Sequence, residues 1–302
     1  MDILCVGEIL IDLIGQEKAS LDQTTAFTKV LGGSPTNVAI NTSRLGLQVG
    51  LVGSVGQDGF GSFALQKIAE VGIDTSTIVA NQQVATSAII VSKSEETPEF
   101  IPYRQADFEI TQKQLGQDLL KSSKIFHTTC FALSQDPAQT SILKAAEEAY
   151  RLGCQLSVDF NYAPKIWLST KPVKKIIETF MQWNPLLKIS EVDVERIFGE
   201  PMDHPSVFEY FHALGVDTIC LTLGSKGVKL SHKGEEPIFL EANPLENILD
   251  VTGAGDAFWA GFLYAFLKEK PWQKCLEIAQ QTAAIKLQRI GHLPAHVASL
   301  LI

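Results

Sequence analysis

Asp250-Val-Thr-Gly-Ala-Gly-Asp256, continued by Ala-Phe-Trp-Ala-Gly-Phe-Leu to position 263, joins a glycine-rich turn to a long apolar helix. The small residues Gly253, Ala254 and Gly255 let an anion approach the main chain at the N–H groups and positive dipole end of this helix. Asp256 stands beside the predicted anion hole, where it can accept a proton from an attacking hydroxyl during phosphoryl transfer. The alternative for this stretch alone is structural: Asp256 stabilises the helix N-terminus and the glycines pack a tight turn.

Two common nucleotide-binding motifs do not fit the chain. Gly253-Ala-Gly255 begins like the dinucleotide fingerprint G-x-G-x-x-G, but Phe258 occupies the position of the third glycine. The sequence contains no G-x-x-x-x-G-K followed by Ser or Thr, so a P-loop fold is not supported. Because the formal net charge is −9, an anionic nucleotide would have to be held by local N–H groups and a metal ion rather than by the overall charge of the protein.

Composition limits the partners and the compartment. The 302 residues carry a formal net charge of −9, so we expect neither nucleic acid nor an anionic membrane as a partner. The five cysteines are scattered without C-x-x-C spacing, which favours a reducing compartment and a cytoplasmic protein. The N-terminus has no basic leader pattern, and the longest strongly apolar stretch, Ala257 to Leu267, is too short to cross a bilayer.

Short apolar runs alternate with helical patterns along most of the chain. The runs Ile3 to Val6, Val49 to Val52 and Ile125 to Thr129 are typical of buried parallel strands. Ser34 is a predicted N-cap, with Pro35 at the first helical position. We therefore expect a single α/β domain over residues 1–302, with a central, mostly parallel sheet flanked by helices.

Two stretches, about 10–30 and 84–105, interrupt this alternation and lack a helix signal. In the second stretch Ser87, Ile89 and Val91 alternate as in a β-strand. We expect the two stretches to form a small β-sheet that acts as a lid over a site. The exposed strand edges of such a lid favour a homodimer that pairs through it.

The segment Gly32-Gly-Ser-Pro-Thr-Asn37 is a second candidate site. Its glycines let the backbone approach a ligand, Asn37 offers an amide, and Asp12 lies in the preceding irregular stretch. A carboxylate, a bare backbone and an amide together suit a polyol, which needs fixed donors and acceptors. The alternative is an ordinary loop. In a third glycine-rich segment, residues 53–61, Asp58 is predicted to cap a helix that begins near Phe60.

With these segments the chain resembles the ribokinase-like carbohydrate kinases, also called the phosphofructokinase-B family, over nearly its full length. The motifs that carry the resemblance, in the family's order, are Gly32-Gly33 through Asn37, Gly53-x-x-Gly56-x-Asp58-x-x-Gly61, Thr222-Leu-Gly224 and Asp250-x-Thr-Gly-Ala-Gly-Asp256. The resemblance implies a ribokinase-like α/β fold with a small β-sheet lid. It also implies ATP with Mg²⁺, and Asp256 as the base that deprotonates a sugar hydroxyl.

The resemblance also assigns binding residues by position. It implies sugar contacts from Asp12, Gly33 and Asn37, and nucleotide contacts from Thr222, Gly224 and Gly227. Ser190 and Asp193 stand where the family often has Asn-x-x-Glu, which implies cofactor binding by Ser190 and Mg²⁺ contact by Asp193. Asp250 and the carbonyl of Thr252 resemble a monovalent-cation site. A potassium requirement stays open, because Gly291-His292 replaces the family's usual Gly-Ala.

The segments 7–12 and 159–167 resemble the fructokinase and 2-keto-3-deoxygluconate kinase branches more than ribokinase itself, which implies a substrate contact from Asn161. Those branches usually carry Arg where Ala163 stands, and its absence weakens the sugar-acid interpretation, because Arg binds a carboxylate bidentately. Tyr103 and Arg104 in the predicted lid are further candidates for substrate contacts. The alternative for that pair is a solvated surface Arg beside a packed Tyr.

The sequence therefore predicts an ATP-dependent sugar kinase, with fructose as the preferred acceptor and a small-molecule sugar as the binding partner. The alternatives within the family are a 2-keto-3-deoxygluconate kinase or another sugar or nucleoside kinase. An alternative of a different class is a non-catalytic sugar- or nucleotide-binding regulator on the same fold.

Two further patterns favour structural roles. His292 and His296 have i, i+4 spacing but no third metal ligand, so we expect solvent-exposed or capping histidines. Trp259, Phe262 and Phe266 recur at helical spacing, so we expect all three to be buried in the core.

Overall fold

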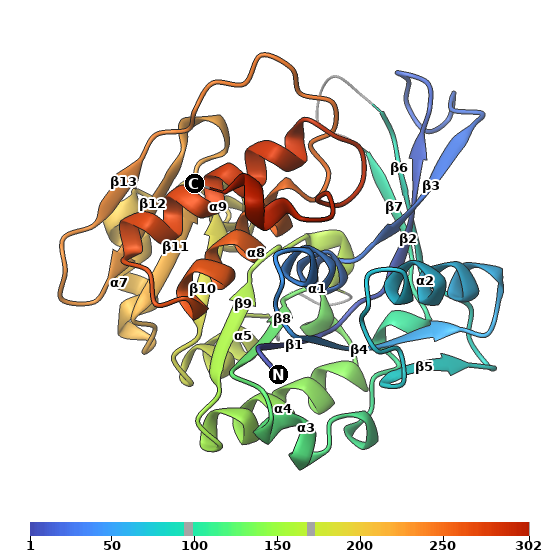
Figure 1. Cartoon of the computed structure of the whole chain (residues 1–302), viewed down its shortest axis with the longest axis horizontal. Coiled ribbons are helices and arrows are strands. Elements are labelled where there is room, and N and C mark those ends of the chain that lie inside the picture. The colour runs from blue at the N-terminus through green and yellow to red at the C-terminus, as the bar shows by residue number, and fades with distance from the viewer. Residues whose placement is uncertain (94–98, 168–172, 302) are drawn as a thin grey trace.

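The computed structural model describes residues 1–93, 99–167 and 173–301, which form a large sheet covered by helices and a smaller sheet beside it (Figure 1). The strands of the large sheet are β1 (Ile3–Val6), β4 (Val49–Gly56), β5 (Ile78–Asn81), β8 (Ile125–Thr129), β9 (Gln155–Asp159), β10 (Leu186–Ser190), β11 (Thr218–Thr222), β12 (Val228–His232) and β13 (Ile238–Leu240). The helices are α1 (Ser34–Arg44), α2 (Gly59–Ala69), α3 (Gln117–Lys121), α4 (Ala138–Arg151), α5 (Val173–Met181), α6 (Glu191–Phe198), α7 (His204–Ala213), α8 (Ala254–Leu267) and α9 (Trp272–Leu287).

The large sheet has the strand order β13-β12-β11-β10-β9-β8-β1-β4-β5. The strands from β11 to β5 pair in parallel, whereas β12 and β13 are antiparallel at one edge. From β1 the chain continues to β4 on one side, and from β8 it continues to β9 on the other. The neighbours β1 and β8 therefore mark a topological switch point, where α/β folds place their ligand sites. The predicted mostly parallel sheet is confirmed.

Both faces of the large sheet are buried, which explains why its strands are continuously apolar. On β1, Ile3 and Cys5 pack against α1, α2, α8 and α9, while Leu4 and Val6 pack on the opposite face against a second helical layer that includes α4 and α5. All four side chains are fully buried. One core therefore lies on each side of the sheet.

The smaller sheet is formed by β2 (Leu10–Gly15), β3 (Phe27–Gly32), β6 (Ala88–Val91) and β7 (Phe100–Tyr103). Its order is β3-β2-β6-β7, with β2 and β6 parallel and the other pairs antiparallel. It extends from one side of the large sheet, at the upper right of Figure 1. These strands fall in the two stretches predicted to form a lid, except that β3 continues to Gly32. Part of the second stretch, residues 94–98, lies outside the described residues.

One predicted helix cap is wrong and another is confirmed. Gly33, not Ser34, is the N-cap of α1, and the Ser34 hydroxyl instead donates a hydrogen bond to Asp256. Asp58 caps α2 as predicted, accepting from the N–H groups of Phe60 and Gly61. The hydroxyl of Ser34 thus serves a distant carboxylate rather than its own helix.

The predicted core residues are largely confirmed. Trp259 and Phe262 are fully buried, but Phe266 is only partly buried near the end of α8. All five cysteines are free and buried. No helix within the described ranges combines the length and hydropathy needed to span a membrane.

Candidate active site

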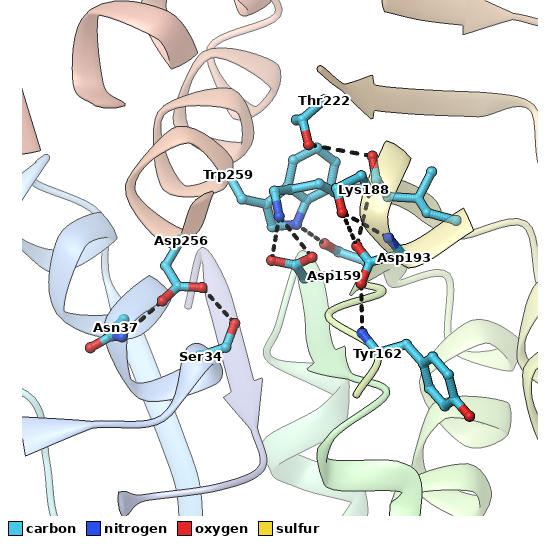
Figure 2. Close-up of polar contacts among 12 residues, drawn as sticks. Ser34, Asn37, Asp159, Tyr162, Lys188, Asp193, Thr222, Asp256 and Trp259 are labelled. Carbon is cyan, nitrogen blue, oxygen red and sulfur yellow. Dashed lines mark hydrogen bonds and ion pairs between the residues drawn. The ribbon is translucent and has the colours of Figure 1, made fainter. Parts of the chain in front are cut away.

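The carboxyl ends of the parallel strands bring together residues that are far apart in the sequence. Thr129, Asp159, Ser190 and Thr222 are the last residues of β8, β9, β10 and β11. Helix α8 begins beside these strand ends, with Lys188 and Asp159 near its first turn (Figure 2). This arrangement places the glycine-rich turn at the edge of the sheet where ligands bind in α/β folds.

Asp256, the third residue of α8, is held by two side chains from α1. The Ser34 hydroxyl donates to Oδ1 at 2.6 Å, and the Asn37 amide Nδ2 donates to Oδ2 at 2.8 Å (Figure 2). The Asp256 residue is 8% exposed. Its carboxylate is therefore fixed in one orientation while part of it stays accessible to a ligand.

Glu8, which we did not assign from the sequence, joins the start of α1 to the end of β8. Its carboxyl group accepts from the Ser34 N–H at 3.1 Å and from the Thr129 hydroxyl at 3.0 Å. Burial raises the pKa of Glu8 to about 8. A carboxyl group that is neutral at pH 7 adds no second negative charge near Asp256.

Gly32 and Gly33 are each required by a close contact. A Cβ atom at Gly32 would lie 2.1 Å from Oδ2 of Asp12, so a side chain there would displace that carboxyl group. Gly33 has a φ of +99°, and its Cβ would lie 2.2 Å from the carbonyl oxygen of Glu8. A structural reason for both glycines is thus present, whether or not Gly33 also contacts a sugar.

Asp12 projects from the smaller sheet into a polar pocket beside Asp256. Burial, followed by the negative charges of Asp256 and Asp250, raises the pKa of Asp12 to about 7. The pocket is lined by Asp12, Ile14, Val30, Leu31, Asn37, Asn41, Asp250, Thr252, Gly253, Lys286, Gly291 and His292. The predicted sugar contacts Asp12 and Asn37 therefore share one pocket with the start of α8.

His292 is not the exposed or capping residue that we expected. Its Nε2 lies 3.0 Å from Oδ1 of Asn37, and burial, followed by the charges of Arg44 and Lys286, lowers the pKa of His292 to about 4. The imidazole is therefore neutral, and Nε2–H donates to the amide oxygen, because Asn37 uses its nitrogen to donate to Asp256. No pattern in the sequence indicates this contact.

The turn that opens α8 can hold an anion as predicted, except that the N–H of one residue is already hydrogen-bonded. Gly253 is the N-cap in a left-handed conformation with φ +72°, which favours glycine. The Ala254 N–H donates to the Val251 carbonyl at 3.2 Å, so it is already used within the turn. The N–H groups of Gly255 and Asp256 follow in the first helical turn, where intrahelical acceptors are lacking.

A buried ion pair that we did not predict adjoins this turn. Lys188 Nζ binds both oxygens of Asp159, at 2.8 and 2.7 Å, and lies 3.3 Å from where a Cβ at Gly255 would stand. Burial would lower the pKa of Lys188, but the carboxylates of Asp159, Asp193 and Asp256 together outweigh burial, so the pKa is raised. The ammonium of the Lys188–Asp159 ion pair thus stands next to the start of α8.

Asp193 and Ser190 have a structural arrangement. Ser190 is the N-cap of α6, and Oδ2 of Asp193 accepts from its N–H at 3.0 Å and from its hydroxyl at 2.6 Å. The other oxygen of Asp193 accepts from the Tyr162 N–H at 2.8 Å. Oδ2 of Asp193 is thus occupied by two donors and Oδ1 by one, and Mg²⁺ contact by Asp193 stays a prediction. Within the described ranges, no group of three or more His, Cys, Asp or Glu side chains is arranged to hold a metal ion.

The predicted nucleotide residues form one loop after β11. Thr222 ends this strand, Gly224 begins a short 3₁₀ turn with φ +59°, and Gly227 follows with φ +120°. A Cβ at Gly227 would lie 2.2 Å from the carbonyl oxygen of Leu240, so this glycine is needed where β13 passes. The loop lies at the same sheet edge as α8, and its nucleotide contacts stay a prediction.

The remaining predicted substrate residues lie away from the pocket lining. Tyr103 is 59% exposed on β7, and Asn161 is exposed in a left-handed conformation with φ +34° after β9. Arg104 is buried, with Nε donating to Asp107 at 2.8 Å and Nη1 to Ser134 at 2.7 Å. A substrate contact from Arg104 does not fit, because its guanidinium is paired inside the protein.

Comparison with known proteins identifies the family of this chain. The model of the pfkB family of carbohydrate kinases matches residues 1–295. An ATP-dependent 6-phosphofructokinase from Thermoanaerobacterium thermosaccharolyticum is 35% identical over 292 residues, which are 96% of this chain and 89% of that protein.

Solved structures show the same similarity. The fructokinase of Halothermothrix orenii has a TM-score of 0.84 and 32% identity, covering 95% of this chain and 99% of that one. A sugar kinase from Pyrococcus horikoshii in complex with ATP has a TM-score of 0.85 and 28% identity, covering 97% and 95%. The chain belongs to the pfkB family of carbohydrate kinases and is a phosphotransferase with an alcohol acceptor, as its sequence predicted.

Proposed function

We propose that this protein transfers the γ-phosphoryl group of MgATP to a hydroxyl of a neutral sugar, with fructose as the preferred acceptor. The observation that carries the proposal is the orientation of Asp256, whose two oxygens are held by Ser34 and Asn37 at the opening of α8. A fixed carboxylate beside backbone donors can remove the hydroxyl proton as the phosphoryl group moves.

In this mechanism the rate enhancement comes mainly from holding the sugar hydroxyl, the γ-phosphoryl group and the base in the correct positions. The N–H groups of Gly255 and Asp256, in the first turn of α8 after Gly253, stabilise negative charge on the transferred group, and the absence of a side chain at Gly255 lets its oxygens approach. The Lys188 ammonium adds positive charge at the same place. Neutral His292 holds Asn37, which in turn holds the catalytic carboxylate, and so acts as a positioning residue.

Mg²⁺ is expected to enter with the nucleotide. This ion retains several waters and binds mainly through phosphate oxygens, so it does not need a preformed protein cage. Ser190, Asp159 and Asp193 border the strand ends and would contact its waters rather than the ion itself. When bound, the ion neutralises charge on the transferred phosphoryl group.

The pocket favours a neutral sugar over a sugar phosphate. Asp12, Asp250 and two Asn side chains line it, and the one ammonium among the described lining residues, Lys286, is bound to Asp250 at 3.0 Å. A phosphate dianion in this pocket would meet carboxylates without an unpaired cation to bind. The second candidate is fructose 6-phosphate, which is favoured by the 35% identity to a 6-phosphofructokinase.

A substrate panel tests the proposal. ADP formation by the purified protein with MgATP would be measured for fructose, other hexoses, ribose, a nucleoside, 2-keto-3-deoxygluconate and fructose 6-phosphate. We expect the highest kcat/KM with fructose. A preference for fructose 6-phosphate or the sugar acid would overturn the neutral-sugar assignment. If no compound of the panel supports ADP formation, while calorimetry shows binding of a sugar or nucleotide, the protein would instead be a non-catalytic regulator.

The smaller sheet is proposed to close over the bound sugar. Its strands β2 and β3 carry Asp12, Ile14 and Val30 into the pocket lining, so a ligand there would contact the sheet directly. Amide hydrogen exchange in β2 and β3 should slow when sugar binds. Unchanged exchange under saturating sugar would contradict closure. A homodimer through the free edges of this sheet stays a prediction, testable by light scattering.

A further inference from the structure

Lys286, in the last turn of α9, is a buried cation next to the candidate active site. The residue is 4% exposed and lines the polar pocket together with Asp250 and Thr252. Its Cε lies 3.8 Å from where a Cβ at Gly253 would stand, which places its side chain against the first residue of the anion-hole turn. A lysine buried to this extent needs partners for its charge.

Three oxygen atoms surround the ammonium group of Lys286. Oδ2 of Asp250 lies 3.0 Å away, the carbonyl oxygen of Arg289 lies 3.3 Å away, and the carbonyl oxygen of Asp250 lies 3.5 Å away. An ammonium group has three N–H donors and no acceptor, so these oxygens match its donors in number. The set of one carboxylate and two carbonyls is also one that suits a hard monovalent ion.

The same contacts occupy the groups that the sequence assigned to a monovalent cation. Oδ2 of Asp250 binds Lys286, and Oδ1 accepts from the Thr252 N–H at 2.9 Å. A potassium ion at Asp250 would share that carboxylate with a buried ammonium and would be repelled by it. A monovalent-cation site formed by Asp250 and Thr252 therefore does not fit the described residues.

The ammonium also fixes the turn that leads into α8. The N–H groups of Leu249 and Asp250 donate to the Leu287 carbonyl, at 2.8 and 3.4 Å, which joins this segment to the end of α9. Lys286 adds the ion pair to Asp250. Because Asp250 in turn holds Thr252, the charge of Lys286 is connected to the backbone immediately before Gly253.

We propose that Lys286 supplies, as a tethered ammonium, the positive charge that a bound monovalent cation would otherwise place beside the anion hole, so that this kinase works without potassium. The proposal rests on the proposed kinase function. It makes Lys286 a positioning residue, which acts through Asp250 and the turn at residues 250–253 rather than by touching the reacting atoms.

The first test compares cations with the unmodified protein. Sugar-dependent ADP formation would be measured in potassium-free buffer with tetramethylammonium as the counter-ion, and again with potassium at equal ionic strength. We expect kcat and the KM for ATP to differ by less than about twofold. Activation by potassium of about tenfold or more would overturn the proposal.

The second test removes the tethered charge. Lys286→Ala should lower kcat by about tenfold or more in tetramethylammonium buffer, and potassium or ammonium ions should restore part of it. The matched control is Lys274→Ala, which removes a partly exposed lysine from the first turn of the same helix. The control should retain its activity in both buffers. Loss of activity in Lys286→Ala without any rescue would indicate a merely structural lysine and overturn the proposal.

A third measurement does not depend on turnover. Thermal unfolding would be followed with potassium or tetramethylammonium for both the unmodified protein and Lys286→Ala. We expect potassium to raise the Tm of the variant selectively, because the three oxygens are then free to bind it. Equal Tm values for the variant in both salts would contradict the proposal. If no acceptor is phosphorylated by the unmodified protein, the proposed function fails while this measurement still tests Lys286.

Discussion

Two buried carboxylates near helix N-termini, Asp256 and Asp193, are used in different ways. Asp256 is 8% exposed and Asp193 is 5% exposed, so burial does not distinguish them. Asp193 accepts from Ser190 and completes the capping of its own helix, α6. Asp256 instead accepts from Ser34 and Asn37, which lie on α1 more than two hundred residues earlier in the chain.

This difference is why we assign Asp193 to helix capping and propose Asp256 as the base. Asp193 binds the backbone and hydroxyl of its own N-cap through one oxygen, and only the backbone N–H of Tyr162 through the other. A carboxylate that is held by side chains of another helix, beside N–H groups of its own first turn, keeps a fixed orientation toward a ligand. Asp193 and Asp256 are alike in burial and in their position on a helix. Only their hydrogen-bond partners distinguish them.

The largest expected effect comes from Asp256→Asn. Without the base, kcat should fall roughly 10²-fold or more, with a modest change in KM, because proton removal is lost while the pocket keeps its shape. Steady-state kinetics with the best acceptor of the panel would measure this. Circular dichroism and thermal unfolding should show a folded variant, and near-normal turnover would contradict the assigned base.

Ser34→Ala should have the next largest effect. It removes one of the two hydrogen bonds that orient Asp256, and a hydrogen bond to a charged group is worth enough to lower kcat by about tenfold. The KM for ATP should change little. Ser62→Ala is a matched control, because Ser62 is exposed and its hydroxyl binds only the local Asp58 carbonyl. An equal loss in the two variants would argue against orientation by Ser34.

Asp12→Asn should change the dependence of stability on pH. Because its pKa is raised on folding to about 7, ionisation of Asp12 destabilises the protein increasingly as pH rises from its ordinary value near 4 to about 7. The variant should therefore unfold at a higher Tm than the unmodified protein at about pH 8, and this difference should vanish near pH 4. The KM for sugar should rise several-fold, because a charged acceptor is lost.

Asp58→Asn should change the Tm at neutral and high pH in the opposite direction to Asp12→Asn. Hydrogen bonds from Thr86 and from the backbone outweigh burial and lower the pKa of Asp58. Its ionised form therefore stabilises the fold above its ordinary pKa, and removal of the charge should lower the Tm at neutral and high pH. Thermal unfolding curves across pH would compare the two variants, and shifts of the same sign would refute the assignment for Asp12.

Asp193→Ala should have the smallest effect on turnover and a clear effect on stability. Loss of this cap should lower the free energy of unfolding by about 1 kcal/mol or somewhat more, since the Tyr162 N–H also loses its acceptor. Urea unfolding would measure this loss of stability. Asp203→Ala is the control, because it removes an exposed cap from another helix, α7. A large rise in the KM for MgATP, without a loss of stability, would restore the role of Asp193 in binding magnesium.

The sequence was most informative where the signal is local. The alternation of apolar runs and helical patterns predicted the α/β layers, and the position of Asp58 before a helix predicted a cap that the structure confirms. Ser34 has the same local signature as a cap, yet its hydroxyl serves Asp256. A residue type with two favourable partners cannot be assigned from spacing alone, because the distant partner is known only after folding.

By itself, therefore, the sequence determined the layered sheet, the glycine-lined start of α8 and the carboxylate at Asp256, because each is encoded by residues adjacent in the chain. Only the tertiary structure decided which partners surround them: His292 against Asn37, Lys188 beside Gly255, and Lys286 on Asp250. These contacts join residues from different strands and helices, and a buried charge or amide is satisfied by whichever group the packing brings within hydrogen-bond distance. No short sequence motif indicates which groups become these partners.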